Sequence, residues 1–203
     1  MAPSAAVWVS AAAAPHRSEA THVVAVAGPR LAAADQEVAE VAALRGAEAF
    51  TGSAATADAV LRAMRSAACV HIAAHGRLRV DNPLLSSLEL ADGQLTVYDL
   101  EHLPATPRLV VLPACQSGLA SVHAGDEVMG LAHALLSLGS VAVIAAVVPV
   151  PDEATRPLMI NLHRNLVDGL SPAAALSAAQ AAHDRADPRS VAAAAGFVCF
   201  GAG

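Results

Sequence analysis

The sequence predicts an α/β fold in which helices cover both faces of a mostly parallel sheet. Short runs rich in β-branched residues are apolar throughout, as expected for strands that are buried on both faces. Segments with helical periodicity separate these runs. Alanine supplies 51 of the 203 residues and aromatic residues only 2%. Small side chains must therefore fill the interior, which suits helices packed closely on a sheet.

The predicted strands are the apolar runs bounded by Gly, Pro or polar residues. They cover residues 23–27, 69–73, 109–113, 141–148 and 197–200. Two further strands are predicted over 87–90 and 94–96, because the turn sequence Ala91-Asp92-Gly93 between them predicts a β-hairpin.

The predicted helices follow residues that favour helix starts. They cover residues 35–44, 56–64, 126–138, 152–167 and 171–185. The first has Val38, Val41 and Leu44 at helical spacing among Glu37 and Glu40, which predicts an amphipathic helix. Thr56, Asp152 and the Ser171-Pro172 pair precede or open three of the others.

Composition excludes several classes of protein. The net charge of −6 argues against a nucleic-acid binder, which needs a basic surface. The longest apolar run, 141–150, is too short to cross a bilayer, and the start of the chain has no basic region typical of a signal peptide. Three widely spaced cysteines favour a reducing compartment. We therefore expect a single cytoplasmic domain over residues 1–203 with no membrane partner. All basic residues are arginine and none is lysine, which favours a bacterial origin.

Two predicted strands end in residues that carry chemistry. The strand over 69–73 leads into His75-Gly76, and the strand over 109–113 leads into Cys115-Gln116-Ser117-Gly118. Sites in open α/β sheets form beyond the carboxyl ends of the strands. If the two strands are neighbours, His75 and Cys115 face one crevice as the minimal cysteine-hydrolase pair. The backbone N–H groups of Gly76 and Cys115 would then form an oxyanion hole.

Cysteine and histidine residues also have common structural roles. Most cysteines in an alanine-rich core are inert small hydrophobes, and Cys69 and Cys199 fit this because they lie inside predicted strands. Cys115 follows its strand and precedes polar residues. His71 and His75 have a spacing that suggests zinc on a helix, but four strand residues span about 13 Å. No nucleotide-binding glycine motif occurs, so we expect neither a metal nor a cofactor.

The sequence resembles the CHAT domain, a family related to caspases and separase and commonly fused to tetratricopeptide repeats. The resemblance runs from Ser4 to Phe200. It rests on the segments 75–76, 82–85, 88–93, 112–118, 125–131, 149–155 and 194–198, which occur in the family's order. The aromatic residue that usually precedes the closing strand is missing, and relatives usually have a further segment, including a strand, before the equivalent of Ser4.

This resemblance implies a caspase-like α/β/α sandwich and a cysteine endopeptidase. His75 takes the position of the catalytic histidine and Cys115 that of the nucleophile, with Gly76 and the Cys115 backbone at the oxyanion hole. The candidates for the substrate pocket are Asp152, Asp126, Gln116 and Ser117. For the two aspartates, a role as N-terminal helix caps is favoured over a role as pocket acids.

The expected partners are a protein or peptide substrate and a tetratricopeptide-repeat or other regulatory module. The leading hypothesis is therefore a regulated endopeptidase that uses a His75–Cys115 dyad. The alternative is a catalytically silent interaction module with the same fold. Thiol reactivity separates them, because an activated Cys115 reacts faster than a buried thiol.

Overall fold

The computed structural model describes residue 9 and residues 22–77, 79, 82–104, 106–113, 124–150 and 152–202. The strands are β1 (Val23–Ala27), β2 (Glu48–Phe50), β3 (Cys69–Ala73), β4 (Gly76–Arg77), β5 (Ser87–Leu90), β6 (Gly93–Thr96), β7 (Leu109–Leu112), β8 (Ala142–Ala146) and β9 (Phe197–Gly201). The α-helices are α2 (Ala34–Arg45), α3 (Ala57–Met64), α4 (Val97–Glu101), α5 (Ala124–Ser137), α6 (Asp152–Val167), α7 (Pro172–Ala181) and α8 (Pro188–Gly196). Two short 3₁₀ helices cover Gly52–Ala54 and Pro83–Leu85.

The main sheet has six strands in the order β2-β1-β3-β7-β8-β9. All neighbouring pairs are parallel except β8 and β9, which are antiparallel. The carboxyl ends of β1, β3, β7 and β8 therefore meet at one edge of the sheet. A second sheet, β4-β5-β6, is antiparallel and contains the hairpin that follows the β3 strand.

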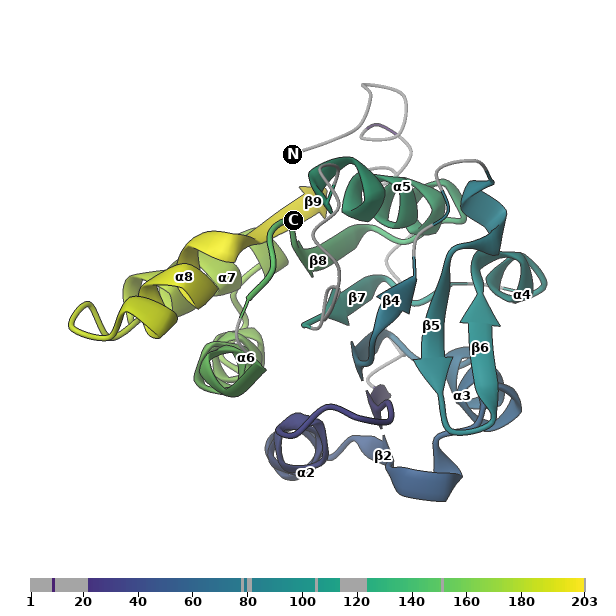
Figure 1. Cartoon of the computed structure of the whole chain (residues 1–203), viewed down its shortest axis with the longest axis horizontal. Helices are drawn as coiled ribbons and strands as arrows, with labels where there is room; N and C mark the ends of the chain where they lie inside the picture. The colour runs from purple at the N-terminus through teal and green to yellow at the C-terminus, as the bar shows by residue number, and fades with distance from the viewer. Residues whose placement is uncertain are drawn as a thin grey trace.

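Helices cover both faces of the main sheet, so the fold is an α/β/α sandwich (Figure 1). On one face, Val24, Val70, Val110 and Val143 pack with side chains of α3, α5 and the β5–β6 hairpin. On the other face, alternate strand residues pack with α2, α6 and α7. No described helix is long and apolar enough to cross a membrane.

The predicted strands and all five predicted helices are confirmed, with shifts of a few residues at several ends. Thr56 caps α3 as expected, because its side chain accepts the N–H of Ala59. Among the described residues, the sequence prediction missed two strands, β2 and β4, two α-helices, α4 and α8, and the two 3₁₀ helices. It extended the run over 141–148 too far, since β8 ends at Ala146 and Val148 is exposed.

A chain of hydrogen bonds between three buried polar side chains joins α2, β3 and α6. The Glu37 carboxylate lies 2.9 Å from Nε2 of His71, and Nδ1 of His71 lies 3.0 Å from Nε2 of His163. All three residues are at most 2% exposed. The expectation that Glu37 lies on the polar face of its helix is therefore wrong. It is buried because α6 packs beside α2 and covers this flank.

Burial lowers the pKa of His163 well below its ordinary value of 6.5, and the charges of His71 and Arg45 lower it further. Folded His163 therefore stays neutral at pH values where the unfolded residue takes up a proton. The free energy of unfolding should therefore fall as the pH drops below 6.5, by about 1.4 kcal/mol per pH unit from this residue.

His163→Gln keeps a hydrogen-bond donor beside His71. The variant should flatten the pH dependence of the free energy of unfolding, measured by urea titrations between pH 7 and 5. Replacement of the exposed His102 by glutamine should leave the slope unchanged.

Candidate active site

His75 lies two residues beyond β3, at the edge of the sheet where the parallel strands end. The strand next to β3 in the sheet is β7, and Val111 of β7 pairs with His71 of β3 in parallel register. The loop after β1, residues 28–33, reaches the same edge and provides contacts for His75. The strands β3 and β7 are therefore neighbours, which is the condition that the His75–Cys115 prediction requires.

The His75 side chain is oriented by a backbone carbonyl. Nε2 lies 3.3 Å from the carbonyl oxygen of Arg30. A carbonyl oxygen can only accept, so Nε2–H is the donor. In the neutral ring this leaves the lone pair on Nδ1. The contact therefore selects Nδ1 as the nitrogen that can take a proton from a nucleophile.

The backbone of the histidine segment is held by β5. The N–H of Glu89 donates to the carbonyl of His75 over 2.8 Å, and Gly76 pairs with Leu88. This pattern makes Gly76 and Leu88 a non-hydrogen-bonded pair, in which the N–H of Gly76 points away from β5. A Cβ added to Gly76 would meet only Leu88 Cδ2, at 4.0 Å. Packing among the described residues does not require a glycine here.

Gly28 permits a close approach of three backbone segments beside His75. Its N–H donates to the carbonyl of Ala73 over 2.8 Å. A Cβ added to Gly28 would lie 2.6 Å from both the Ala74 Cβ and the carbonyl oxygen of Glu89. Glu89 is held by strand pairing in β5, and Ala74 directly follows β3 and precedes His75, so neither can move without shifting its own segment.

Gly28→Ala should therefore displace the segment that holds His75. We expect a loss of about 1–3 kcal/mol in the free energy of unfolding from overpacking. Any activity that depends on His75 should fall by about 10²-fold, the effect of a shift near 1 Å. Urea denaturation and kinetics measure the two effects. Gly46→Ala is the control, in a turn where no described atom lies within 4 Å of the added Cβ; the positive φ of 60° at Gly46 is the strain that this substitution introduces. Full activity in Gly28→Ala would contradict the prediction.

Several predicted site residues lie beyond what the structure describes. Cys115, Gln116 and Ser117 are outside the described residues, and so is the side chain of Asp126, whose backbone belongs to α5. These four predictions stay predictions.

Asp152 opens α6, and its carboxylate accepts the N–H of Ala33 over 3.0 Å. Ala33 is the N-cap residue of α2 and ends the loop that also carries Arg30. Asp152 and His75 therefore contact the same loop. This contact gives the carboxylate a structural role at a helix start, although at the start of α2 rather than of its own helix.

The two described thiols are poor nucleophiles. Burial raises the pKa of Cys69 to about 11, and burial also raises the pKa of Cys199. Both therefore stay protonated at neutral pH, as expected for structural cysteines. Any fast-reacting thiol of this chain has to be found elsewhere.

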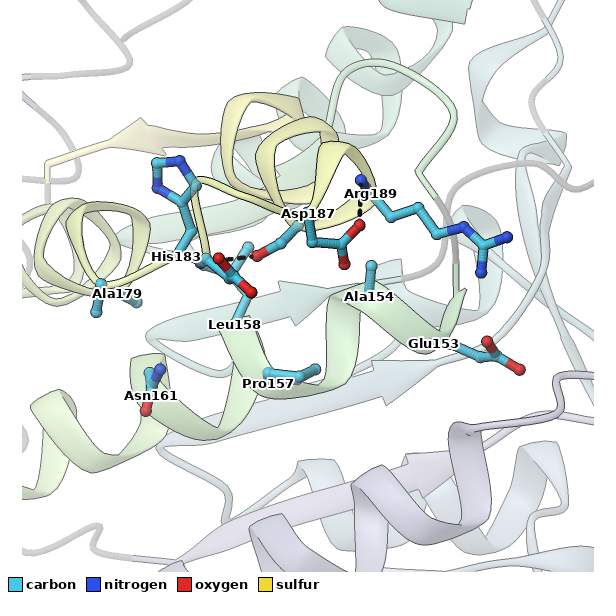
Figure 2. Close-up of a pocket in the computed structure, with 12 residues that line it drawn as sticks. Glu153, Ala154, Pro157, Leu158, Asn161, Ala179, His183, Asp187 and Arg189 are labelled. Atoms are coloured by element: carbon cyan, nitrogen blue, oxygen red, sulfur yellow. Dashed lines mark hydrogen bonds between the residues drawn. The ribbon is translucent and has the colours of Figure 1, made fainter.

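A cavity of about 430 Å³ lies between α6, α7 and the start of α8 (Figure 2). None of its lining residues is one of the predicted site residues. Its floor is apolar, with Ala154, Pro157 and Leu158. Two acidic groups at its rim, Asp184 and Asp187, accept backbone N–H groups of their own turn and helix start. Within the described ranges, no three His, Cys, Asp or Glu residues are arranged to hold a metal ion.

Sequence reasoning missed Arg30 and Glu89. The guanidinium of Arg30 forms an ion pair with the carboxylate of Glu89, and the carbonyl of Arg30 faces His75. The only local signal was Gly28-Pro29 at the carboxyl end of a predicted strand, where sites tend to form. Arg30 and Glu89 come into contact because the β5–β6 hairpin folds back over the loop after β1.

Comparison with known proteins gives a family match over nearly the whole chain. The model of the CHAT domain matches residues 2–202. Tetratricopeptide repeat protein 28 from human is 28% identical over 190 residues, and its mouse counterpart is also 28% identical. Both alignments cover 75% of this chain and 8% of the relative. The chain therefore corresponds to a small part of these much longer proteins.

Two solved structures share the fold of this chain. The complex of the RgpB pro- and mature domains from Porphyromonas gingivalis superposes with a TM-score of 0.63 at 11% identity, over 89% of this chain and 47% of that chain. The Arg-specific cysteine proteinase gingipain R superposes with a TM-score of 0.59 at 13% identity, over 89% and 46%. At these identities the likeness concerns the fold.

Proposed function

Because the chain belongs to the CHAT-domain family and has the fold of known cysteine peptidases, we propose that it is a cysteine endopeptidase with a His75–Cys115 dyad. The observation that carries the proposal is the orientation of His75. Its imidazole is fixed at the carboxyl end of β3 by the Arg30 carbonyl, beside the strand that leads to Cys115.

The position of Cys115 in the sequence supports the pairing. Pro113 directly follows β7, and Cys115 comes two residues later. Two residues of chain span at most about 7 Å, which supports a place for Cys115 beside the carboxyl end of β7. The ends of β3 and β7 are adjacent. A crevice between them would hold the imidazole on one side and the thiol on the other.

In the proposed mechanism, Nδ1 of His75 takes the proton of the Cys115 thiol, and the thiolate attacks the carbonyl carbon of the scissile peptide bond. The N–H groups of Gly76 and Cys115 stabilise the oxyanion of the tetrahedral intermediate. The His75 imidazolium then protonates the leaving amine, and the acyl-enzyme thioester remains. Water, deprotonated by His75, hydrolyses this thioester and restores the thiol. The outward N–H of Gly76 supports this role, and among the described residues only Leu88 Cδ2, at 4.0 Å, would meet a Cβ added to Gly76.

Substrate choice is proposed to involve Asp152, Asp126, Gln116 and Ser117. Asp152 belongs to this group because it contacts the loop that orients His75. The relatives' name also supports a link to tetratricopeptide repeats, and we propose that such a module, attached or separate, regulates cleavage.

Comparison of the wild type with Cys115→Ala on a proteome-derived peptide library tests the proposal. We expect new peptide termini, read by mass spectrometry, only with the wild type, because the variant lacks the nucleophile. Cys199→Ala is the matched control and should cleave normally. The residue before each cut tests Asp152 and Asp126 as pocket acids. Equal products from the wild type and Cys115→Ala would contradict the dyad.

Iodoacetamide labelling at pH 6 separates an enzyme from a silent module without a substrate. Cys69 and Cys199 should react slowly, because burial raises the pKa of both thiols. Cys115 should react much faster if His75 activates it. Labelling of Cys115 at the rate of an ordinary thiol would favour the interaction module.

A further inference from the structure

We propose that Glu89 is a positioning residue for His75 and acts through its ion pair with Arg30; this inference rests on the proposed catalytic role of His75. Glu89 lies on β5, Arg30 in the loop after β1, and His75 beyond β3. The hairpin therefore places a carboxylate beside the loop whose carbonyl orients the imidazole.

The contacts among these three residues form a closed ring. The His75 imidazole donates to the carbonyl of Arg30. The guanidinium of the same Arg30 donates through one nitrogen to both carboxylate oxygens of Glu89. The backbone N–H of Glu89 donates to the carbonyl of His75. Glu89 thus fixes the backbone of the histidine directly and its side chain through Arg30.

Arg30 has a backbone conformation that needs support. Its φ of 64° lies in the left-handed region, and no other described non-glycine residue has a positive φ. Non-glycine residues adopt this region rarely, and such conformations persist where surrounding contacts hold them. The Arg30 carbonyl direction depends on this φ. The ion pair restrains the side chain of the same residue, so it also restrains the direction in which the carbonyl points.

The ion pair contributes little to the stability of the fold. The side chain of Arg30 is 65% exposed and that of Glu89 18%, and exposed pairs are screened by solvent. Loss of the pair should therefore change the orientation of the imidazole without unfolding the protein. A purely structural salt bridge would affect neither the imidazole nor catalysis.

The test uses the full chain with ¹⁵N-labelled histidines and the variant Glu89→Gln, which keeps the backbone N–H and the side-chain volume. Long-range ¹H–¹⁵N spectra at pH 8 report the tautomer of each ring, and His75→Asn assigns the His75 signals. We expect the Nε2–H tautomer in the wild type and a mixture of tautomers in Glu89→Gln. The kcat for peptide cleavage should fall about 10-fold or more, with little change in KM. Arg30→Gln and the double variant should resemble Glu89→Gln, because all three break the same pair.

Glu40→Gln is the matched control, because it breaks another Arg–Glu pair, between Glu40 on α2 and Arg156 on α6. It should change neither the His75 signals nor kcat. Unchanged His75 signals in Glu89→Gln would overturn the proposal, and so would altered signals with an unchanged kcat. If the wild type cleaves no peptide, the proposed function fails. The tautomer measurement still decides whether the contacts among Arg30, His75 and Glu89 orient the imidazole.

Discussion

Replacement of His75 by asparagine should lower kcat/KM for peptide cleavage by about 10²–10⁴-fold, the usual contribution of a general acid–base group. The variant loses both the acceptor for the thiol proton and the donor for the leaving amine. Initial rates on a peptide found in the library experiment measure the loss. The labelling rate of Cys115 at pH 6 should fall in parallel, because less thiolate is present.

The fold should tolerate this change, since His75 is only partly buried and asparagine can still donate to the Arg30 carbonyl. The melting temperature should therefore stay close to that of the wild type. His102→Asn, in an exposed histidine at the end of α4, should leave kcat/KM unaltered. Retention of activity in His75→Asn would show that another group acts as the base.

Glu37→Leu should lower the free energy of unfolding by about 3–5 kcal/mol, the range for breaking a buried polar pair by removal of one partner. The substitution leaves Nε2–H of His71 without its acceptor in a site that excludes water. His163 depends on the same chain of hydrogen bonds, because its Nε2 contacts Nδ1 of His71. Urea denaturation at pH 7.5 measures the loss.

Glu40→Leu is the matched control, one helical turn further along α2. Its partner Arg156 is about one-third exposed, so the change should cost at most about 1 kcal/mol. A second comparison replaces Glu37, His71 and His163 together by leucine, which removes all three members of the buried chain. This triple variant should be more stable than Glu37→Leu alone. Similar losses in Glu37→Leu and Glu40→Leu would contradict the energetic role of the buried chain.

Local patterns were sufficient to predict most of the fold. Strands such as β1 and β3 consist of apolar runs with clear ends, and α6 starts and ends at the predicted residues. Two helices were missed for different reasons. Thr96 and Asp99 form a capping box that opens α4, but Thr96 is also the last residue of the hairpin strand β6, which hides the helix start in the sequence. The alanines of α8 give no contrast between faces, although Asp187-Pro188 marks its start.

The candidate site was predictable only where it follows the chain locally. His75 and Gly76 come directly after a recognisable strand, so their place at the sheet edge followed from the sequence. Arg30 and Glu89 are 59 residues apart, and only the packing of the hairpin against the loop after β1 brings them together. The burial of Glu37 also depends on a distant element, since α6 covers its side of the helix.

The closed ring of contacts around His75 also bears on when a newly made chain could acquire the proposed peptidase activity. Its three members enter the polypeptide in the order 30, 75 and 89, and β7 follows them. Contacts between distant segments form only after the later segment has been synthesised. The imidazole is therefore made before the hairpin that holds it and before Cys115. We expect a nascent chain on the ribosome to remain unable to cleave its neighbours until the hairpin and β7 have emerged and joined the sheet.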